Sequence, residues 1–330
     1  MARIGYTLMT EQSGPASLVR YARQAEQHGF DFALCSDHYS PWLASQGHAP
    51  YAWTVLGAVA EATNQLELAT FVTCPIRRYH PVVVAQKAAT LQLLSEGRFI
   101  LGLGSGENLN EHVLGEGWPP VDVRQQMLRE AVEIIRQLLS GSSVTTRRTY
   151  FNASQARLWD CPEQPIPIAV AVSGNRSIRR FAPVADHLIT TSPERRILDQ
   201  WRQHHPAGGP SPRSFIQLPI CWAPEESAAV ELAHDQFRWS TTGWSVNAEL
   251  PTTDAFAAAT AAIRPDDIAG SIPCGPDLDR IAAAFQPAVD AGFTDIGLVQ
   301  VGDRYQQDFL EQAAEPLIER IRGLRSATPR

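Results

Sequence analysis

The sequence predicts an α/β protein in which eight parallel strands, each followed by a helix, close into a (β/α)8 barrel, the TIM-barrel architecture. Three observations lead to this fold class. The chain has 330 residues, the length of one such barrel with insertions, and 44% of them are hydrophobic. Short apolar runs alternate with longer helical patterns, without a lasting change in composition. We therefore expect residues 1–330 to form a single barrel domain.

The first half of the chain contains four strand–helix pairs. Strands are expected at short apolar runs, and helices where apolar residues recur every three or four positions. The helix expected over Ser17–His28 ends before Gly29, a residue type that commonly terminates helices. In order, the expected elements are strand Ile4–Met9, helix Ser17–His28, strand Phe32–Cys35, helix Trp53–Ala62, strand Leu66–Val72, helix His80–Leu94, strand Arg98–Leu103 and helix Asp122–Leu139.

Two segments interrupt this rhythm in the second half of the chain. A polar stretch at about 142–165 is expected to form a hairpin or loop, and residues of about 237–273 form an insertion. A doubly wound sheet is the structural alternative, but it should carry a GxGxxG turn after the first strand, and Met9–Ser13 has none. The remaining expected elements are strand Ile166–Val172, a helix from about Arg176, strand Asp186–Thr190, a helix from about Glu194, strand Ser214–Trp222, helix Glu226–Gln236, a helix from about Asp277, strand Asp295–Val299 and helix Tyr305–Gly323.

Composition and charge exclude several classes of function. The net charge of −7 is spread along the chain and no stretch is rich in Lys or Arg, so we expect no nucleic-acid partner. The N-terminus has no signal-peptide pattern, and no run approaches the roughly 18 apolar residues of a membrane helix. The five cysteines are far apart and the nine histidines are scattered. We expect a cytoplasmic protein with reduced thiols, no bound metal and a small-molecule substrate.

In a closed barrel, the active site lies where the carboxyl ends of the strands meet. Acid–base groups and small polar side chains follow several of the expected strands, so we expect them to share one site. They are Glu11, Asp37, His38, Thr73, Ser105, Glu107, Asn108, Asn110, Ser173, Asn175 and Ser192.

Three of these loops offer specific chemistry, and each also has a simpler structural explanation. His38 could exchange a proton near neutral pH, or lie at the surface beside a helix-capping Asp37. Glu107 follows the glycine-rich run Gly102–Gly106 and could donate a proton if it is buried, although a plain strand-to-helix turn would also explain the glycines. Residues 172–177 could hold a phosphate at a helix N-terminus, or form an ordinary helix cap.

Several segments together resemble one protein family. They are Ser36-Asp37-His38 with Trp42, Gln46-Gly47-His48-Ala49-Pro50, Thr73-Cys74-Pro75 with His80-Pro81, and the run Gly104–Glu111. In this order they resemble the luciferase-like F420-dependent oxidoreductases, and most closely the subgroup of F420-dependent glucose-6-phosphate dehydrogenases. The resemblance runs from residue 3 to about residue 192 and then weakens to the barrel rhythm.

The resemblance implies a bacterial-luciferase-like TIM barrel, usually a homodimer, with coenzyme F420 over the barrel mouth. It also implies a cis peptide bond at Phe71–Val72. In the implied mechanism His38 takes a hydroxyl proton, Trp42 forms one wall of the site, and Glu107 protonates the reduced ring or stabilises its developing charge. Glu11 matches another active-site carboxylate. The implied coenzyme contacts are Asp37, Phe71, Val72, Ser105, Asn110, Ser173, Gly174, Asn175 and Arg176.

The sequence departs from the resemblance where these dehydrogenases hold a sugar phosphate with two lysines and an arginine. The corresponding segments are Ser192-Pro193-Glu194, Phe256–Thr260 and Ala269-Gly270-Ser271, with Arg264 as the only cation nearby. A phosphate monoester requires cations, so we expect an apolar or neutral substrate rather than glucose 6-phosphate. The aromatic residues of the insertion would suit such a substrate, or belong to the core or a dimer interface. They are Phe237, Trp239, Trp244 and Phe256.

The sequence thus predicts an F420-dependent oxidoreductase that transfers a hydride between an alcohol or carbonyl compound and C5 of the coenzyme. Substrate identity, reaction direction, oligomeric state and the role of residues 237–273 stay open. The alternatives are an FMN-dependent luciferase-like monooxygenase, a sugar-phosphate dehydrogenase with an altered phosphate site, and a non-catalytic F420-binding protein. The collinear segments around residues 36–42 and 106–110 argue against the first, and the intact acid–base residues argue against the last.

Overall fold

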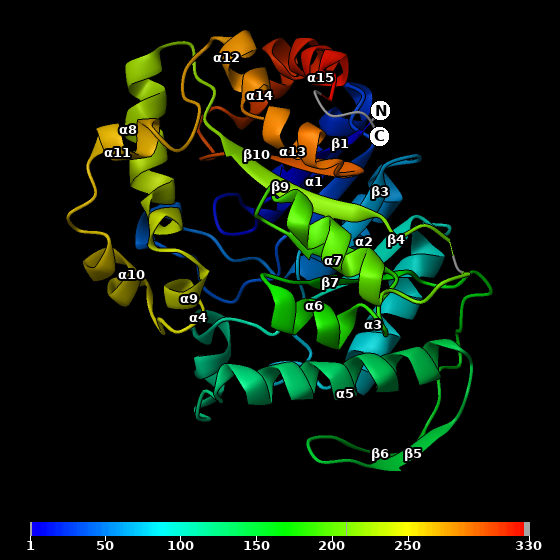
Figure 1. The fold of residues 1–330 in the computed structure, drawn as a ribbon. Coiled ribbons are helices and arrows are strands. Elements are labelled where there is room, and N and C mark those ends of the chain that lie inside the picture. The colour runs from blue at the N-terminus through cyan, green and yellow to red at the C-terminus, as the bar shows by residue number, and fades with distance from the viewer. Residues whose placement is uncertain (1, 209, 327–330) are drawn as a thin grey trace.

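The centre of the protein is a closed barrel of eight parallel strands surrounded by helices (Figure 1). The structure is a computed structural model and describes residues 2–208 and 210–326. Around the barrel the strand order is β1, β10, β9, β8, β7, β4, β3, β2, so the predicted (β/α)8 barrel is confirmed and the doubly wound alternative is wrong. The barrel strands are β1 (Arg3–Leu8), β2 (Phe32–Cys35), β3 (Glu67–Thr70), β4 (Phe99–Leu103), β7 (Ile168–Ala171), β8 (His187–Thr190), β9 (Ser214–Ile220) and β10 (Asp295–Gln300).

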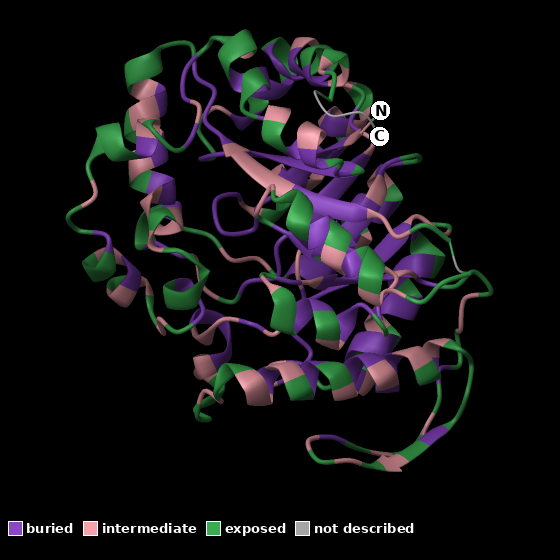
Figure 2. Ribbon diagram, viewed as in Figure 1, coloured by how far each residue is buried: buried purple, intermediate pink, exposed green. Residues whose placement is uncertain are grey.

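Helices cover the outside of the barrel with their apolar faces turned inward. The longest, α5, alternates buried and exposed residues along its length (Figure 2). The first, α1, ends as predicted, because Gly29 adopts a φ of +83° that terminates the helix. The main helices are α1 (Pro15–Gln27), α2 (Ala52–Ala62), α3 (Pro81–Leu94), α5 (Val121–Leu139), α6 (Asn175–Phe181), α7 (Arg195–His204), α8 (Glu226–Phe237), α12 (Leu278–Ala283), α13 (Gln286–Ala291), α14 (Gln306–Gln312) and α15 (Ala314–Gly323).

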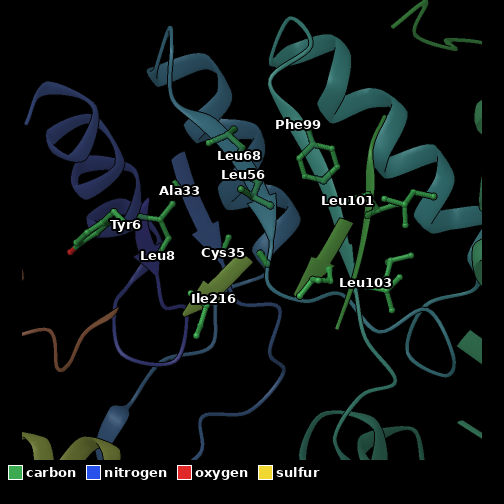
Figure 3. Close-up of a cluster of buried hydrophobic side chains, with 14 of the residues drawn as sticks. Tyr6, Leu8, Ala33, Cys35, Leu56, Leu68, Phe99, Leu101, Leu103 and Ile216 are labelled. Carbon is green, nitrogen blue, oxygen red and sulfur yellow. The ribbon is translucent and has the colours of Figure 1, made fainter. Parts of the chain in front are cut away.

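Both faces of the barrel wall are packed with side chains, which explains the unbroken apolar runs of the strands. Inside the barrel, the rings of Phe32 and Phe215 meet edge to face at 5.8 Å. Gly5 leaves room for Phe32, because a Cβ at this position would lie 2.1 Å from that ring. Outside the barrel, a larger core joins the strands to the helices, and Figure 3 shows Leu56 of α2 within the part of it formed by β1 to β4.

Proline splits two helices that the apolar pattern predicts as continuous. The prediction of one helix over Tyr305–Gly323 is wrong, because α14 ends at Gln312 and α15 then begins. Pro316 has no N–H, and its ring would clash with the carbonyl group of Gln312, four residues earlier. Pro287 acts in the same way on Ala283, which ends α12, so the helix expected from about residue 277 is divided into α12 and α13.

The two segments that interrupt the rhythm form a hairpin and a group of short helices. Residues 142–165 contain the antiparallel strands β5 (Val144–Arg147) and β6 (Asn152–Ala156), which lie apart from the barrel (Figure 1). The insertion contains η3 (Arg238–Thr242), α9 (Trp244–Asn247), α10 (Thr253–Ala259) and α11 (Pro265–Ala269). Three short helices lie in loops after the strands: η1 (Ala44–Gln46), α4 (Asn108–Glu111) and η2 (His112–Leu114).

All five cysteines are free thiols, and four of them are buried. Across residues 2–208 and 210–326, no helix is both long and apolar enough to cross a membrane.

Candidate active site

Three of the predicted catalytic residues, Glu11, His38 and Trp42, meet beyond the carboxyl ends of β1 and β2. Glu11 is only 1% exposed. Its Oε1 accepts a hydrogen bond from Trp42 Nε1 at 3.1 Å and lies 3.4 Å from His38 Nε2. Its Oε2 accepts hydrogen bonds from the hydroxyl groups of Ser36 and Thr10. Each oxygen of this buried carboxyl therefore has polar partners, as the burial of a charged group requires.

The backbone orients the imidazole ring of His38. Its Nδ1 lies 3.2 Å from the carbonyl oxygen of Ser40. Since a carbonyl oxygen can only accept, Nδ1 carries the hydrogen, and Nε2 of the neutral ring then presents a lone pair to Glu11. The approach of Nε2 to Oε1 is favourable only when a proton lies on one of the two groups. Glu11 and His38 thus place a carboxyl oxygen and an imidazole nitrogen next to each other.

The insertion packs against Trp42 and fixes its position. Trp239 stacks on Trp42 with the ring centres 4.1 Å apart and the planes 8° from parallel. Phe256 contacts the same indole edge to face, with the ring centres 5.1 Å apart. Phe256 and Phe237 are buried in the core, one of the two roles expected for these aromatics, whereas Trp244 is 47% exposed. The insertion therefore supports the wall that Trp42 was predicted to form.

The loop after β4 is tied to the loop after β2 through Asn110. Its Oδ1 accepts hydrogen bonds from the backbone N–H groups of Tyr39 at 2.8 Å and Ser40 at 3.3 Å. Its Nδ2 donates to Glu107 Oε2 at 3.1 Å. Glu107 itself is half-buried and precedes α4. Asn110 thus links Glu107 to the backbone of the two residues that follow His38.

Asp37 holds together the loops after β2 and β3. Trp53 Nε1 and Thr73 Oγ1 donate to its Oδ2 at 3.1 Å and 2.7 Å. Arg78 Nη2 and Tyr79 Oη donate to its Oδ1, both at 3.0 Å. The carboxylate therefore has two protein donors on each oxygen, and its predicted contact with the coenzyme stays a prediction.

Another buried carboxyl, Glu111, was not found by the sequence analysis. Its Oε2 accepts a hydrogen bond from the backbone N–H of Arg78 at 2.7 Å, and its Oε1 lies 3.8 Å from Arg78 Nε. Burial raises the pKa of Glu111 to about 7, an effect that Arg78 opposes and Glu107 adds to. The sequence contains one signal for Glu111, its spacing of four residues from Glu107, because residues four apart on a helix share a face.

The loops after β3, β4 and β7 contain the other predicted coenzyme contacts. The peptide bond between Phe71 and Val72 is cis, as the resemblance implies. Both residues pack partly buried against the barrel interior, and Ser105 is half-buried after β4. After β7, Ser177 Oγ accepts hydrogen bonds from the backbone N–H groups of Ser173 and Gly174 at 3.2 Å and 3.3 Å.

Asn175 and Arg176 begin α6 on the outer side of this loop, and both are exposed. The guanidinium of Arg176 pairs with the carboxylate of Asp122 on α5. Exposed donors at the carboxyl end of β7 leave room for an anion to bind there.

The segments expected to lack phosphate-binding cations offer little positive charge. Glu194 is exposed and accepts hydrogen bonds from Arg196, which lower the pKa of its carboxyl. Arg264 is exposed and already bonded to Asp267 at 3.0 Å. In the described part of the chain, no group of three or more His, Cys, Asp or Glu side chains is arranged to hold a metal ion.

Comparison with known proteins places the chain in a family. The model of the luciferase-like monooxygenase family matches residues 1–295, so the chain belongs to that family. The resemblance described from the sequence motifs is thereby confirmed.

The chain is also similar to several individual proteins. An F420-dependent glucose-6-phosphate dehydrogenase from Amycolatopsis mediterranei is 33% identical over 335 residues, which cover 98% of this chain and 100% of the relative. A protein of the same name from Beutenbergia cavernae is 45% identical over 198 residues, or 60% of this chain and 59% of the relative. Among solved structures, an F420-dependent secondary alcohol dehydrogenase in complex with an F420–acetone adduct has a TM-score of 0.87 at 25% identity, covering 97% of this chain and 99% of that one.

Proposed function

We propose that the protein is an F420-dependent oxidoreductase that transfers a hydride between an alcohol or carbonyl compound and C5 of the coenzyme. The buried cluster of Glu11, His38 and Trp42 carries the proposal, because it places an acid–base pair at the end of the barrel where TIM-barrel enzymes bind their substrates. The names of the relatives, which include both glucose-6-phosphate and secondary alcohol dehydrogenases, support the choice of coenzyme.

The residues at the barrel mouth fit this coenzyme. The exposed side chains of Ser173, Asn175 and Arg176 offer hydroxyl, amide and guanidinium donors, which suit a phosphate group. When bound, the coenzyme supplies the ring carbon that accepts or gives up the hydride. The other contacts that we propose for it are Asp37, Phe71, Val72, Ser105, Asn110 and Gly174.

The side chains of Glu11 and His38 accept the proton of the substrate's hydroxyl group. In the oxidation of an alcohol, the hydroxyl proton passes to the Glu11–His38 pair, in which Nε2 and Oε1 lie 3.4 Å apart. Trp42 closes one side of the site and keeps its indole N–H on Glu11. Glu107, held by Asn110, exchanges the second proton with the coenzyme side of the site. Carbonyl reduction uses the same groups in reverse.

We propose a neutral substrate with an apolar portion rather than glucose 6-phosphate. The carboxylate of Glu194 is paired with Arg196, and Arg264 is paired with Asp267, so each of these arginines already has an anionic partner. A lone exposed cation typically contributes only about 1 kcal/mol or less. The names of the relatives favour the other candidate, a sugar-phosphate dehydrogenase with an altered phosphate site. Initial rates with a panel of neutral alcohols and sugar phosphates distinguish these two candidate functions. A kcat/KM for glucose 6-phosphate above about 10⁴ M⁻¹s⁻¹ would favour the sugar-phosphate dehydrogenase.

Fluorescence titration of the purified protein with F420 and with FMN tests the coenzyme. We expect micromolar or tighter binding of F420 and much weaker binding of FMN. Equal or tighter binding of FMN would overturn the proposal in favour of a flavin-dependent monooxygenase.

We also propose that the enzyme is a single-domain cytoplasmic protein that acts as a homodimer, as the resemblance implies. Sedimentation of the purified protein measures the oligomeric state, and a monomer at micromolar concentration would contradict the dimer.

A further inference from the structure

Four arginines from two helices surround one open cleft on the outside of the barrel. The cleft has a volume of about 470 Å³ and is lined by Arg129 of α5 together with Asn175, Arg176, Arg179 and Arg180 of α6. We call it the arginine cleft. The helices α5 and α6 lie side by side in Figure 1, and α6 begins directly after the carboxyl end of β7. The cleft therefore starts at the rim of the barrel mouth and continues down its outer wall.

The arginine cleft contains more positive charge than its neighbours neutralise. Arg176 pairs with Asp122 and Arg129 with Glu133. Arg180 donates only to a backbone carbonyl, and Arg179 has no ion-pair partner among the described residues. Both existing pairs are exposed, and such pairs are weak enough to exchange for a better ligand.

The chemistry of this cleft selects a ligand with more than one negative group. Guanidinium groups bind carboxylates and phosphates through two parallel hydrogen bonds, so arginine is the preferred residue for such ligands. The chain as a whole has a net charge of −7, which repels anions elsewhere. Four guanidinium groups around one cleft are therefore a local exception that suits a polyanion.

Two residues connect the cleft with the coenzyme site. Asn175 and Arg176 line the arginine cleft and also belong to the loop after β7 that we propose for the phosphate. F420 extends beyond its phosphate as a chain of glutamates, each of which bears a carboxylate. We propose that the arginine cleft binds this glutamate chain, as an anion subsite separate from the ring site. The inference rests on the proposed coenzyme, and it assigns the glutamate chain of that coenzyme to the arginine cleft.

The test compares F420 bearing one glutamate with F420 bearing several, and measures each Kd by fluorescence titration. The ring and the phosphate are common to both forms, so their contacts cancel in the ratio of the two Kd values. We expect the several-glutamate form to bind about threefold to tenfold more tightly to the unmodified protein, a preference that salt weakens.

Arg179→Glu is the informative variant, because the structure gives this side chain no ion pair whose loss would disturb the fold. We expect Arg179→Glu to bring the ratio of the two Kd values to about one. It should leave unchanged the binding of FO, which is the ring precursor without phosphate or glutamates. Arg23→Glu is the matched control. It makes the same charge change at an exposed position of α1, which follows β1, four strands away around the ring from β7. We expect Arg23→Glu to keep the ratio of the unmodified protein.

Three results would overturn the inference. A ratio near one in the unmodified protein, or a ratio that Arg179→Glu leaves unchanged, excludes the glutamate chain from the cleft. Citrate binding that Arg179→Glu abolishes, combined with a ratio near one, would assign the cleft to a free polyanion instead. If the unmodified protein binds neither form of F420 more tightly than FMN, the proposed coenzyme itself is wrong, and the two failures are thereby distinguished.

Discussion

Arg78 lies between two buried carboxyl groups, and its replacement by methionine tests how the site is held together. Its guanidinium is 8% exposed, with Nη2 3.0 Å from Asp37 Oδ1 and Nε 3.8 Å from Glu111 Oε1. Loss of one partner from a buried ion pair typically costs about 3–5 kcal/mol, because the remaining charge stays buried and unpaired. Asp37 keeps three other donors, so we expect the lower end of that range, a loss of about 3 kcal/mol in the free energy of unfolding.

Equilibrium urea unfolding of Arg78→Met at neutral pH measures this loss. Arg202→Met is the control, since it removes an arginine from an exposed pair with Asp199, and such pairs contribute about 1 kcal/mol or less. If the two variants lose the same free energy, the Asp37–Arg78–Glu111 contacts do not stabilise the loops as the argument requires. We also expect weaker F420 binding by Arg78→Met but not by Arg202→Met, because Arg78 holds Asp37, one of the proposed coenzyme contacts.

Three further predictions follow from the site. Replacing His38 with alanine should lower kcat about 100- to 10,000-fold with F420 affinity nearly unchanged, and retention of half the activity would exclude His38 as the base. Replacing Glu107 with glutamine keeps its shape but removes its titrating proton, so turnover should fall, and an unchanged pH–rate profile would contradict the proton transfer. Burial raises the pKa of Glu111 from 4.5 to about 7, so the folded protein binds this proton more tightly than the unfolded chain. Its contribution to stability is therefore lost as pH rises through about 7, and Glu111→Gln should gain up to about 3 kcal/mol relative to the unmodified protein between pH 5 and pH 8. An equal difference between the two proteins at both pH values would refute this assignment.

The elements that the sequence predicted well are those whose burial is uniform. The strand Phe32–Cys35 was predicted without error, because a parallel strand packed on both faces is a short unbroken apolar run. The last helix was predicted as one piece because its apolar repeat continues across Pro316, and the repeat outweighed the missing backbone donor in the interpretation.

In the site too, the sequence predicted individual residues but not the contacts between residues far apart in the chain. Glu11 and His38 were found because they follow strands that end at one face of the barrel, and Trp42 was found through the family resemblance. The stack of Trp239 on Trp42 joins residues far apart in the chain, and no periodic pattern encodes such a pair. Arg78 was missed because only the folded loops bring it between Asp37 and Glu111.

The parallel indoles of Trp42 and Trp239 have a consequence for observing the protein. Two aromatic transition dipoles at 4.1 Å interact, so the stacked pair should contribute a near-ultraviolet circular dichroism band that depends on their contact. One indole belongs to the loop after β2 and the other to the insertion, so the band exists only while the insertion is seated on the barrel. The contact between the insertion and the loop after β2 can thus be followed optically, without label, substrate or coenzyme.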